Sequence, residues 1–439
     1  MKPGTIVALA SGAGRAGVAV IRLSGPEAGA ALEALTGRAP PKPRRAARRA
    51  FCDHETGLSL DDGLALWFPG PASFTGEDVA ELHVHGGSAV IAAIIDAALT
   101  IKGVRPAEPG EFTRRAFEHG KLDLAEAEGL ADLVDAETEG QRRQALRQHR
   151  GALSLLYETW RERLINAGAL IEAEIDFPDE DLPGVLAQQA GPILAGLIAE
   201  MGRHLDDGKR GERVRDGYRI AIIGPPNAGK SSLLNALAQR EAAIVSDIPG
   251  TTRDVVEVRL VLAGFPVWIA DTAGLREAAD AVEAEGVRRA LARAEEADLR
   301  LGLVEAGSEA PETLLAALRP EDILIRSKAD LSQFAGGPRE KRVSALTGEG
   351  LSELETALAR RVAEALSQEE APALTRARHR RLVEEARAAL ERAVPALERG
   401  PELAGEDVRA AAAALGRLTG KIDVEDLLDQ IFASFCIGK

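Results

Sequence analysis

The chain is poor in aromatic residues and cysteine, and it carries no excess of positive charge. Phe, Trp and Tyr make up 3% of its 439 residues, and the two cysteines are Cys52 and Cys436. Two cysteines exclude a disulfide-rich scaffold and fit a reducing cytosol. There are 54 lysines and arginines against 69 aspartates and glutamates, which gives a net charge of −15. Because an acidic chain does not attract phosphate at long range, any nucleic-acid partner requires a local basic surface.

Long uninterrupted apolar runs are also absent. The apolar stretch 5–21 is broken by Gly12, Gly14, Arg15 and Gly17, which is too interrupted for a signal peptide or a membrane-spanning helix. The composition, 45% hydrophobic and 28% charged, is that of a globular protein. We therefore expect a cytoplasmic protein without membrane association. At about 100–200 residues per domain, the length predicts two to four domains.

Hydrophobic periodicity divides the chain into regions of different pattern. Residues 1–119 combine strand patterns with an apolar helix at 88–99, which predicts an α+β module. Residues 120–214 and 372–439 have helical spacing, whereas 215–371 alternates strands and helices as in a doubly wound parallel sheet. The predicted fold is multidomain: an N-terminal α+β domain, a helical domain in two parts, and an inserted nucleotide-binding α/β domain.

Several elements are specific enough to be checked. Within the first region, strands are predicted at 5–10, 18–23, 62–68 and 79–85, and a basic, proline-bearing loop at 38–49. Residues 141–175 predict one long helix. The spacing Gly12-x-Gly14-x-x-Gly17 matches a dinucleotide-binding fingerprint, but a strand pattern follows it, so we interpret it as a tight turn.

A phosphate-binding loop stands between a predicted strand and a predicted helix. Residues 224–231, GPPNAGKS, match the pattern G-x-x-x-x-G-K-S in full. Backbone N–H groups of such a loop surround the phosphates, the lysine reaches the β- and γ-phosphates, and the serine hydroxyl binds Mg²⁺. The predicted nucleotide contacts here are Asn227, Ala228, Gly229, Lys230, Ser231 and Ser232.

Two further segments have the order and spacing of nucleotide-sensing switches. The run DTAG at 271–274 ends a predicted strand, where the aspartate reaches the Mg²⁺ shell and a glycine N–H can touch the γ-phosphate. The run TTRD at 251–254 precedes it, and a threonine there can close over Mg²⁺. The predicted nucleotide contacts in these segments are Ser246, Asp247, Ile248, Pro249, Gly250, Thr251, Thr252, Asp271, Thr272, Ala273 and Gly274.

Base selection is predicted in the run SKAD at 327–330. The Asp330 carboxylate pairs with the N1–H and 2-amino donors of guanine and repels the acceptor edge of adenine, which favours GTP over ATP. Lys328 can lie along the base, and Ser344 with Ala345 supplies a backbone N–H for the guanine carbonyl. The motif usually begins with asparagine, and Ser327 is shorter. Its contact to guanine N7 and its brace to the phosphate loop are therefore open.

Water activation cannot follow the Ras pattern, because the residue after Gly274 is leucine rather than glutamine. The side-chain carbonyl of Asn227 could hold a monovalent cation near the β- and γ-phosphates, which would replace an arginine finger electrostatically. Glu283 is a candidate for orienting water. The acidic segment 277–286 also fits a solvated helix face.

Other polar clusters leave alternatives open. On the strand 79–85, Glu81, His83 and His85 share one face, which fits a carboxylate for an aminopyrimidine ring, a structural salt bridge or a metal site. Arg22 and Lys121 fit anion binding or surface charge. The basic runs 142–150 and 375–381 fit a nucleic-acid-facing surface or solvated helix faces paired with glutamates.

Beyond the nucleotide motifs, several segments resemble the MnmE (TrmE) family of tRNA modification GTPases over essentially the whole chain. These segments are 14–25, 74–87, 105–133, 175–181 and the terminal residues Cys436-Ile-Gly-Lys439. The resemblance implies a folate-binding N-terminal domain, a discontinuous helical domain and an inserted Ras-like GTPase domain. It also implies a homodimer that forms a heterotetramer with the flavoprotein MnmG, on which FAD is bound. The complex would modify carbon-5 of the wobble uridine of certain tRNAs with a one-carbon unit from 5-formyl- or methylene-tetrahydrofolate.

The resemblance also assigns residues by motif position. It implies K⁺ ligation by Asn227, Ser246, Ile248 and Thr251, Mg²⁺ ligation by Ser231 and Thr252, catalysis by Glu283, and folate contacts by Arg22, Glu81, Lys121 and Lys439. Cys436 would lie near the folate and is a candidate for the modification chemistry. Two alternatives remain: an Era-like GTPase switch in ribosome assembly, and a P-loop ATPase, which Asp330 disfavours.

Overall fold

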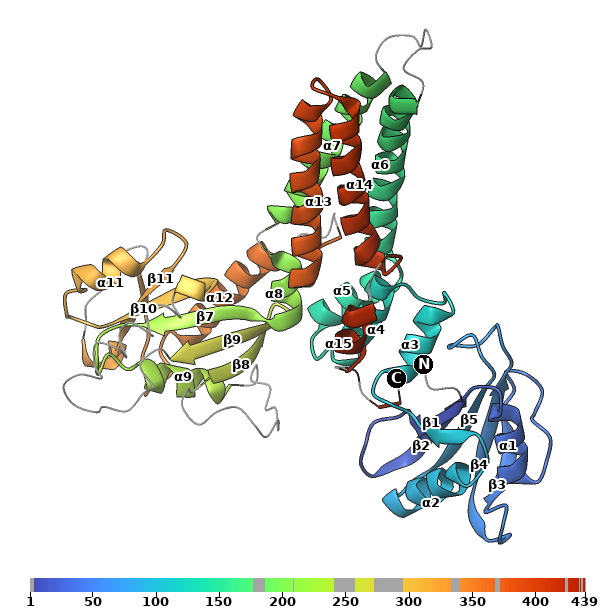
Figure 1. Cartoon of the computed structure of the whole chain (residues 1–439). Helices are drawn as coiled ribbons and strands as arrows, with labels where there is room; N and C mark the ends of the chain where they lie inside the picture. Colours follow the sequence, from blue (N-terminus) through green and yellow to red (C-terminus); the bar gives the residue numbers. More distant parts are fainter. Residues whose placement is uncertain are drawn as a thin grey trace, which may run out of the picture. The chain divides into compact units, whose positions relative to one another are not determined.

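The computed structural model describes residues 4–176, 186–207, 209–240, 257–271, 295–332, 340–367, 372–422, 425–433, 435 and 437–438. They form two compact units, the first of residues 1–131 with 413–439 and the second of 132–412 (Figure 1). The domain boundaries at 119, 214 and 371 stay predictions. Over the described ranges, no helix is both long and apolar enough to cross a membrane.

The first unit is built on a six-stranded sheet with the strand order β3-β4-β5-β2-β1-β6. Its elements are β1 (Thr5–Leu9), β2 (Ala16–Ser24), α1 (Ala28–Thr36), β3 (Ala47–Cys52), β4 (Ser59–Phe68), β5 (Val79–Gly86), α2 (Ser88–Leu99) and β6 (Val104–Pro106). All neighbouring strands are antiparallel except β1 and β6. On β5, Ala80, Leu82 and Val84 are buried beneath α1 and α2, as strand alternation requires.

The strand predictions in this unit are confirmed, and the loop prediction for 38–49 is wrong at its end. Residues 47–49 belong to β3, an edge strand in which half-buried and exposed residues alternate up to the buried Phe51. The basic composition of residues 38–49 indicated a loop, but an edge strand also accepts charged side chains. The glycine-rich segment 12–17 runs into β2 from Ala16 onward, so a strand follows it, as predicted, and not the helix of a dinucleotide-binding fingerprint.

Helices from both ends of the chain complete the first unit. These are α3 (Glu111–Glu118), α4 (Leu124–Val134) and α15 (Glu425–Ala433). A small core joins them through Leu124, Phe432 and Phe435. Gly110 begins α3 in a left-handed conformation, and a Cβ there would lie 2.6 Å from the carbonyl oxygen of Phe432. The close approach requires glycine.

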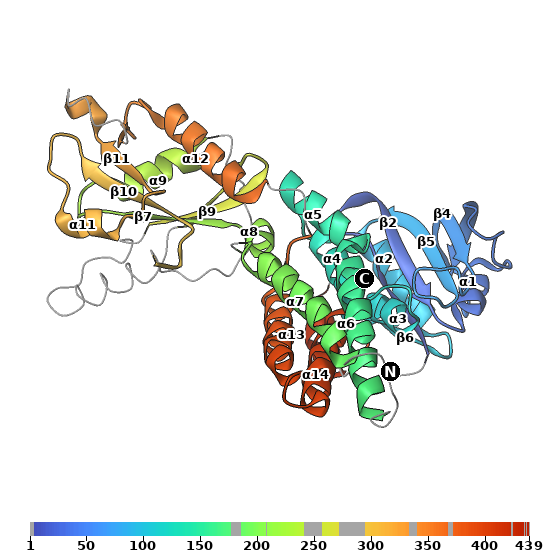
Figure 2. The ribbon, with the colours of Figure 1, turned by 90° about the horizontal axis from the view of Figure 1, so that it is seen from above.

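The second unit contains a bundle of helices, which are seen together in Figures 1 and 2. They are α5 (Glu139–His149), α6 (Ala152–Asp176), α7 (Leu186–Leu205), α13 (Ala377–Ala396) and α14 (Pro401–Thr419), of which α14 belongs to this unit up to residue 412. The prediction of one helix over 141–175 is wrong, because α5 and α6 separate at Gly151, whose φ is 84°. The bundle buries Tyr157, Trp160 and His379, and the ring of His379 lies edge-on to Tyr157.

The inserted α/β part of the second unit has the strand order β12-β11-β10-β7-β9-β8. Its elements are α8 (Arg210–Asp216), β7 (Tyr218–Ile223), α9 (Lys230–Ala238), β8 (Glu257–Leu262), β9 (Phe265–Asp271), β10 (Leu299–Glu305), α11 (Glu312–Ala317), β11 (Ile323–Ser327), the 3₁₀ turn η1 (Ala329–Leu331), β12 (Glu340–Arg342) and α12 (Leu351–Leu366). The sheet is parallel as predicted, except that β8 pairs antiparallel with β9 through a tight turn at Ala263-Gly264. That turn is too short for a crossover helix, so β8 must be antiparallel.

Candidate functional site

The nucleotide motifs converge at the carboxyl ends of the parallel strands, where ligands bind in open α/β sheets. The phosphate loop follows β7, Asp271 ends β9, Glu305 ends β10 and Ser327 ends β11. Because β7 lies between β9 and β10, the loop is flanked by the ends of both neighbours. Segments separated by up to about a hundred positions in the sequence therefore share one edge of the sheet.

The phosphate loop adopts a backbone conformation that few side chains tolerate. Gly224, Asn227 and Gly229 have φ values of 158°, 60° and 91°, and asparagine is among the residues that accept a left-handed conformation. A Cβ on Gly224 would lie 2.3 Å from the carbonyl oxygen of Leu303. The glycine is therefore required by the packing of the loop on β10.

Lys230 begins α9 as a buried side chain, with a relative exposure of 6%. Its Nζ donates to the carbonyl oxygens of Gly224 and Pro225, both at 2.9 Å. Burial lowers the pKa of this amine, and the charge of Asp271 opposes the shift. The ammonium group is thus fixed inside the loop at a cost in hydration, an arrangement that an incoming phosphate would relieve.

Ser231 and Asp271, both predicted to serve the Mg²⁺ site, are in direct contact. Ser231 Oγ donates to Asp271 Oδ2 at 2.7 Å, and Asp271 has a relative exposure of 2%. A hydroxyl and a carboxylate are the hard oxygen donors that Mg²⁺ prefers, usually beside water and substrate phosphates. The donor set therefore fits magnesium.

The residues predicted to select the base lie together beyond the carboxyl ends of β11 and β12. Ser327 Oγ donates to the carbonyl oxygen of Ala228 at 2.6 Å, so the shorter serine keeps the brace to the phosphate loop. Ser344 Oγ contacts Asp330 Oδ1 at 2.5 Å. Lys328 Nζ forms an ion pair with Glu305 at 2.8 Å. Glu305 was not predicted, although its place at the end of a parallel strand was a usable signal.

Other predicted residues lie outside the described part of the chain. They are Ser246, Asp247, Ile248, Pro249, Gly250, Thr251, Thr252, Thr272, Ala273, Gly274, Glu283, Cys436 and Lys439. Their roles stay predictions.

In the first unit, two of the predicted folate contacts pair with each other. Arg22 and Glu81 are opposite each other in the β2–β5 register, and Arg22 Nε and Nη2 lie 3.0 and 2.9 Å from Glu81 Oε1. The guanidinium also lies over the rings of Phe74 and Phe112, at 5.5 and 5.7 Å from their centroids. The salt bridge and a ligand-binding role are compatible, because a carboxylate offers two oxygens.

The loop around Phe74 also reaches the third predicted folate contact. A Cβ on Gly76 would lie 2.9 Å from Cβ of His119 and 3.5 Å from Cε of Lys121. Lys121 is exposed. Arg22 and Lys121 therefore border one loop, and Glu81 is joined to it through its ion pair with Arg22. The sequence had offered Phe74 within the family-like run 74–87, but no periodicity marked it as a neighbour of Arg22.

The C-terminal tail reaches the same sheet. Gly438 has a φ of 99°, and a Cβ there would lie 1.9 Å from the carbonyl oxygen of Leu9, at the end of β1. The neighbouring β1 residue Ala8 is opposite Arg22. Gly438 thus lies against β1, the neighbour of the strand that carries Arg22.

A metal site on β5 is not supported. His83 Nε2 lies 3.5 Å from Glu81 and His85 Nδ1 lies 2.7 Å from Asp61. In the ranges that the structure describes, no group of three His, Cys, Asp or Glu side chains could hold a metal ion.

The basic runs are largely engaged with carboxylates. Arg142 and Arg143 both bond Glu139, at 2.7 and 2.8 Å, and these bonds lower the pKa of Glu139 to about 2. Arg380 pairs with Asp207 and Glu212, at 3.0 and 3.1 Å. These contacts agree with helix faces paired with acidic residues, the alternative to a tRNA-facing surface.

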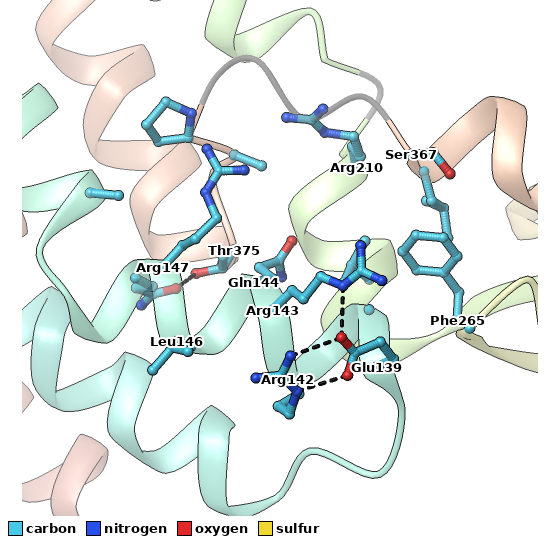
Figure 3. Close-up of a pocket in the computed structure, with 18 of the residues that line it drawn as sticks. Glu139, Arg142, Arg143, Gln144, Leu146, Arg147, Arg210, Phe265, Ser367 and Thr375 are labelled. Carbon is cyan, nitrogen blue, oxygen red and sulfur yellow. Dashed lines mark hydrogen bonds and ion pairs between the residues drawn. The ribbon is translucent and has the colours of Figure 1, made fainter.

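A cavity of about 470 Å³ lies where the helices meet the inserted sheet (Figure 3). Residues of α5, α6, α8 and the β8–β9 turn line it, together with Leu366, Ser367, Pro372, Ala373 and Thr375. Beside it, the N–H of Gly140 donates to Gly264 O at 2.8 Å. A Cβ on Gly140 would lie 2.4 Å from the ring of Phe265. The strand that ends at Asp271 therefore begins against α5.

A largely parallel sheet with a phosphate loop, a Ser231–Asp271 contact that fits Mg²⁺, and an aspartate after β11 where base selection is predicted is the arrangement of a P-loop GTPase. Family models place it more narrowly: "GTP-binding protein TrmE N-terminus" matches residues 5–121 and "MnmE helical domain" matches 124–436. The chain belongs to the MnmE (TrmE) family of tRNA modification GTPases.

Known relatives agree over the whole length. The chain is 61% identical to the tRNA modification GTPase MnmE of Parvibaculum lavamentivorans, over 99% of this chain and 100% of that protein. It is 59% identical to that of Maricaulis maris, over 99% of each chain. Among solved structures, the G domain of the T. maritima FeoB iron transporter covers 34% of this chain and 98% of its own, at 26% identity and a TM-score of 0.24. That score is too low to bear on function.

Proposed function

We propose that this chain hydrolyses GTP with Mg²⁺ and that the nucleotide cycle serves the modification of tRNA. The contact of Ser231 with Asp271 beside the buried Lys230 carries the proposal, in a chain matched end to end by proteins named tRNA modification GTPases. Ser231, Asp271 and Thr252 would hold Mg²⁺, which neutralises charge on the β- and γ-phosphates when bound. Lys230 would bind those phosphates, and Asp330 would select guanine.

Water activation is assigned to Glu283, and charge neutralisation to K⁺ held by Asn227, Ser246, Ile248 and Thr251. The left-handed backbone of Asn227 supports this role, since it holds the residue within the loop that faces the phosphates. A cation there would supply the electrostatic stabilisation that an arginine finger supplies elsewhere.

Potassium dependence can be measured directly. Wild-type GTP turnover should be much faster in KCl than in NaCl, and Asn227→Ala should remove the difference, with a loss of about 10²–10³-fold in KCl. Asn227→Gly is the matched control, because glycine keeps the left-handed backbone without strain and should lose the salt dependence equally. Equal wild-type turnover in both salts would contradict the potassium assignment.

For the modification itself, we assign the one-carbon donor, 5-formyl- or methylene-tetrahydrofolate, to Arg22, Glu81, Lys121 and Lys439. Glu81 offers a carboxylate for an aminopyrimidine edge, and Phe74, with a relative exposure of 36%, lies against Arg22, whose guanidinium is 5.5 Å from its ring centroid. Cys436 is assigned to the chemistry near the folate. The chain would act as a homodimer in a heterotetramer with MnmG, which carries FAD, on the wobble uridine of certain tRNAs.

Mass analysis of tRNA nucleosides from cells lacking the chain tests the whole proposal. Aminomethyl or carboxymethylaminomethyl groups at carbon-5 of the wobble uridine should disappear and return with the wild-type gene. A Gly438→Ala allele should restore them poorly while retaining GTP turnover, because the added Cβ collides with Leu9. An unchanged nucleoside profile would refute the modification role and favour an assembly switch.

A further inference from the structure

The hydroxyl of Ser327 forms its hydrogen bonds within the protein. Ser327 Oγ lies 2.6 Å from the carbonyl oxygen of Ala228 and 3.3 Å from that of Val304, and the residue is buried. Both neighbours accept only, so the hydroxyl must be the donor. The shorter contact, to Ala228, takes the proton.

A serine hydroxyl has one proton, whereas the asparagine amide that usually stands at this position has two. Asparagine can brace the loop with one hydrogen and donate the other to guanine N7, which is an acceptor. Serine can do only one of these. Turning the proton toward N7 would leave the carbonyl of Ala228 buried without its donor, which is unfavourable. Serine is also one atom shorter, so N7 lies farther from it.

The opposite edge of the guanine base has more hydrogen-bond partners in the protein. Ser344 Oγ holds one oxygen of Asp330 at 2.5 Å, and an ionised carboxylate has further lone pairs for the guanine N1–H and 2-amino group. Lys328 is fixed by Glu305 at 2.8 Å, and its left-handed backbone, with a φ of 53°, sets its direction beside the base. Recognition is therefore concentrated on the edge that Asp330 faces.

We propose that this chain selects guanine through Asp330 and does not read position 7 of the purine. The proposal rests on the proposed GTPase function and deepens it. Nucleotides of 7-deazaguanine, in which a C–H replaces N7, are thus ligands equivalent to the natural ones. Ser327 acts as a positioning residue for the phosphate loop rather than as a contact to the base.

The test compares GDP with 7-deaza-GDP by calorimetry on the full-length protein. Wild-type dissociation constants should agree within about twofold. Ser327→Asn should gain a donor and bind GDP about tenfold more tightly than 7-deaza-GDP, the usual value of one hydrogen bond. Ser327→Ala, which removes the brace, should weaken both ligands by the same factor. GTP and 7-deaza-GTP should be hydrolysed with equal kcat/KM by the wild type.

A wild-type preference for GDP of tenfold or more would overturn the inference, and this comparison needs no variant to fold. A folded Ser327→Asn protein that binds both ligands equally would contradict the single-proton account. If the wild type bound or hydrolysed no guanine nucleotide at all, the proposed GTPase function would fail instead, so the two failures are distinguishable.

Discussion

Lys230→Met should abolish GTP-dependent stabilisation and lower kcat/KM for GTP by about 10²–10³-fold, the usual cost of one preorganised charged donor. The same change should leave the nucleotide-free protein as stable as the wild type or about 1 kcal/mol more stable. The loss of GTP binding and the unchanged or higher stability without nucleotide have one cause. The ammonium group is buried against two carbonyl oxygens, and burial disfavours its charged form, as its lowered pKa indicates.

Thermal unfolding with and without Mg²⁺–GTP measures both effects. At a ligand concentration of about 100 Kd, the wild type should gain about 2.7 kcal/mol, and Lys230→Met should gain nothing. Lys341→Met is the matched control, because Lys341 is an exposed lysine on β12 of the same sheet and its loss should leave the GTP shift intact. A Lys230→Met protein that keeps the GTP shift would show that the phosphates bind elsewhere.

Contiguous motifs made the nucleotide site predictable. The conformation of residues 224–231 is determined locally, because the glycines permit the backbone angles of the loop and the preceding strand fixes its position. The sequence also predicted that Ser231, in the first turn of α9, and Asp271, at the end of β9, serve one Mg²⁺ site, because both stand at the carboxyl edge of the parallel sheet. Their direct hydrogen bond was not predicted. The pairing register of strands that are distant in the sequence is harder to predict. That Arg22 and Glu81 are opposite each other depends on how β2 pairs with β5, and neither strand records its partner.

The sequence pattern led to a wrong prediction where one helix and two consecutive helices have the same hydrophobic spacing. The apolar residues keep helical spacing on both sides of Gly151. A glycine inside a helix costs only about 1 kcal/mol, so it did not exclude one continuous helix. In the structure, the positive φ of Gly151 follows the end of α5. The fate of the Ser327 hydroxyl could not be predicted either. The substitution was visible in the sequence, but its acceptor, Ala228, lies about a hundred positions away.

The first unit contains a buried ion cluster around Arg115 that has no signature in the sequence. Arg115, with a relative exposure of 2%, donates to Glu77 at 2.8 Å and to Glu111 at 3.0 Å. It also donates to the carbonyl oxygens of Gly4 and Ser24, at 3.0 and 3.2 Å. One side chain of α3 therefore joins β2, the chain before β1 and the loop that borders the predicted folate contacts.

Glu111 is the second centre of this cluster. Burial by itself would raise the pKa of Glu111, but hydrogen bonds from Arg105, the N–H of Glu108 and Arg115 outweigh burial and hold the pKa below its ordinary 4.5. A lowered carboxyl pKa means that the stabilisation is complete above pH 4.5 and is lost as the pH falls through the folded-state value.

Arg115→Ala should lower the free energy of unfolding of the first unit by about 3 kcal/mol, because Glu77 loses its arginine partner and Glu111 keeps only Arg105 and the N–H of Glu108. Hydrogen exchange of β1 and β2 amides in the full-length protein measures this free energy locally. Arg48→Ala is the matched control: Arg48 is 82% exposed and 3.9 Å from Asp62, so its loss should cost less than about 0.5 kcal/mol. The difference between wild type and Arg115→Ala should narrow below pH 4.5 as Glu111 becomes protonated. A constant difference down to pH 3 would show that Arg115 stabilises the unit by packing rather than through its charge.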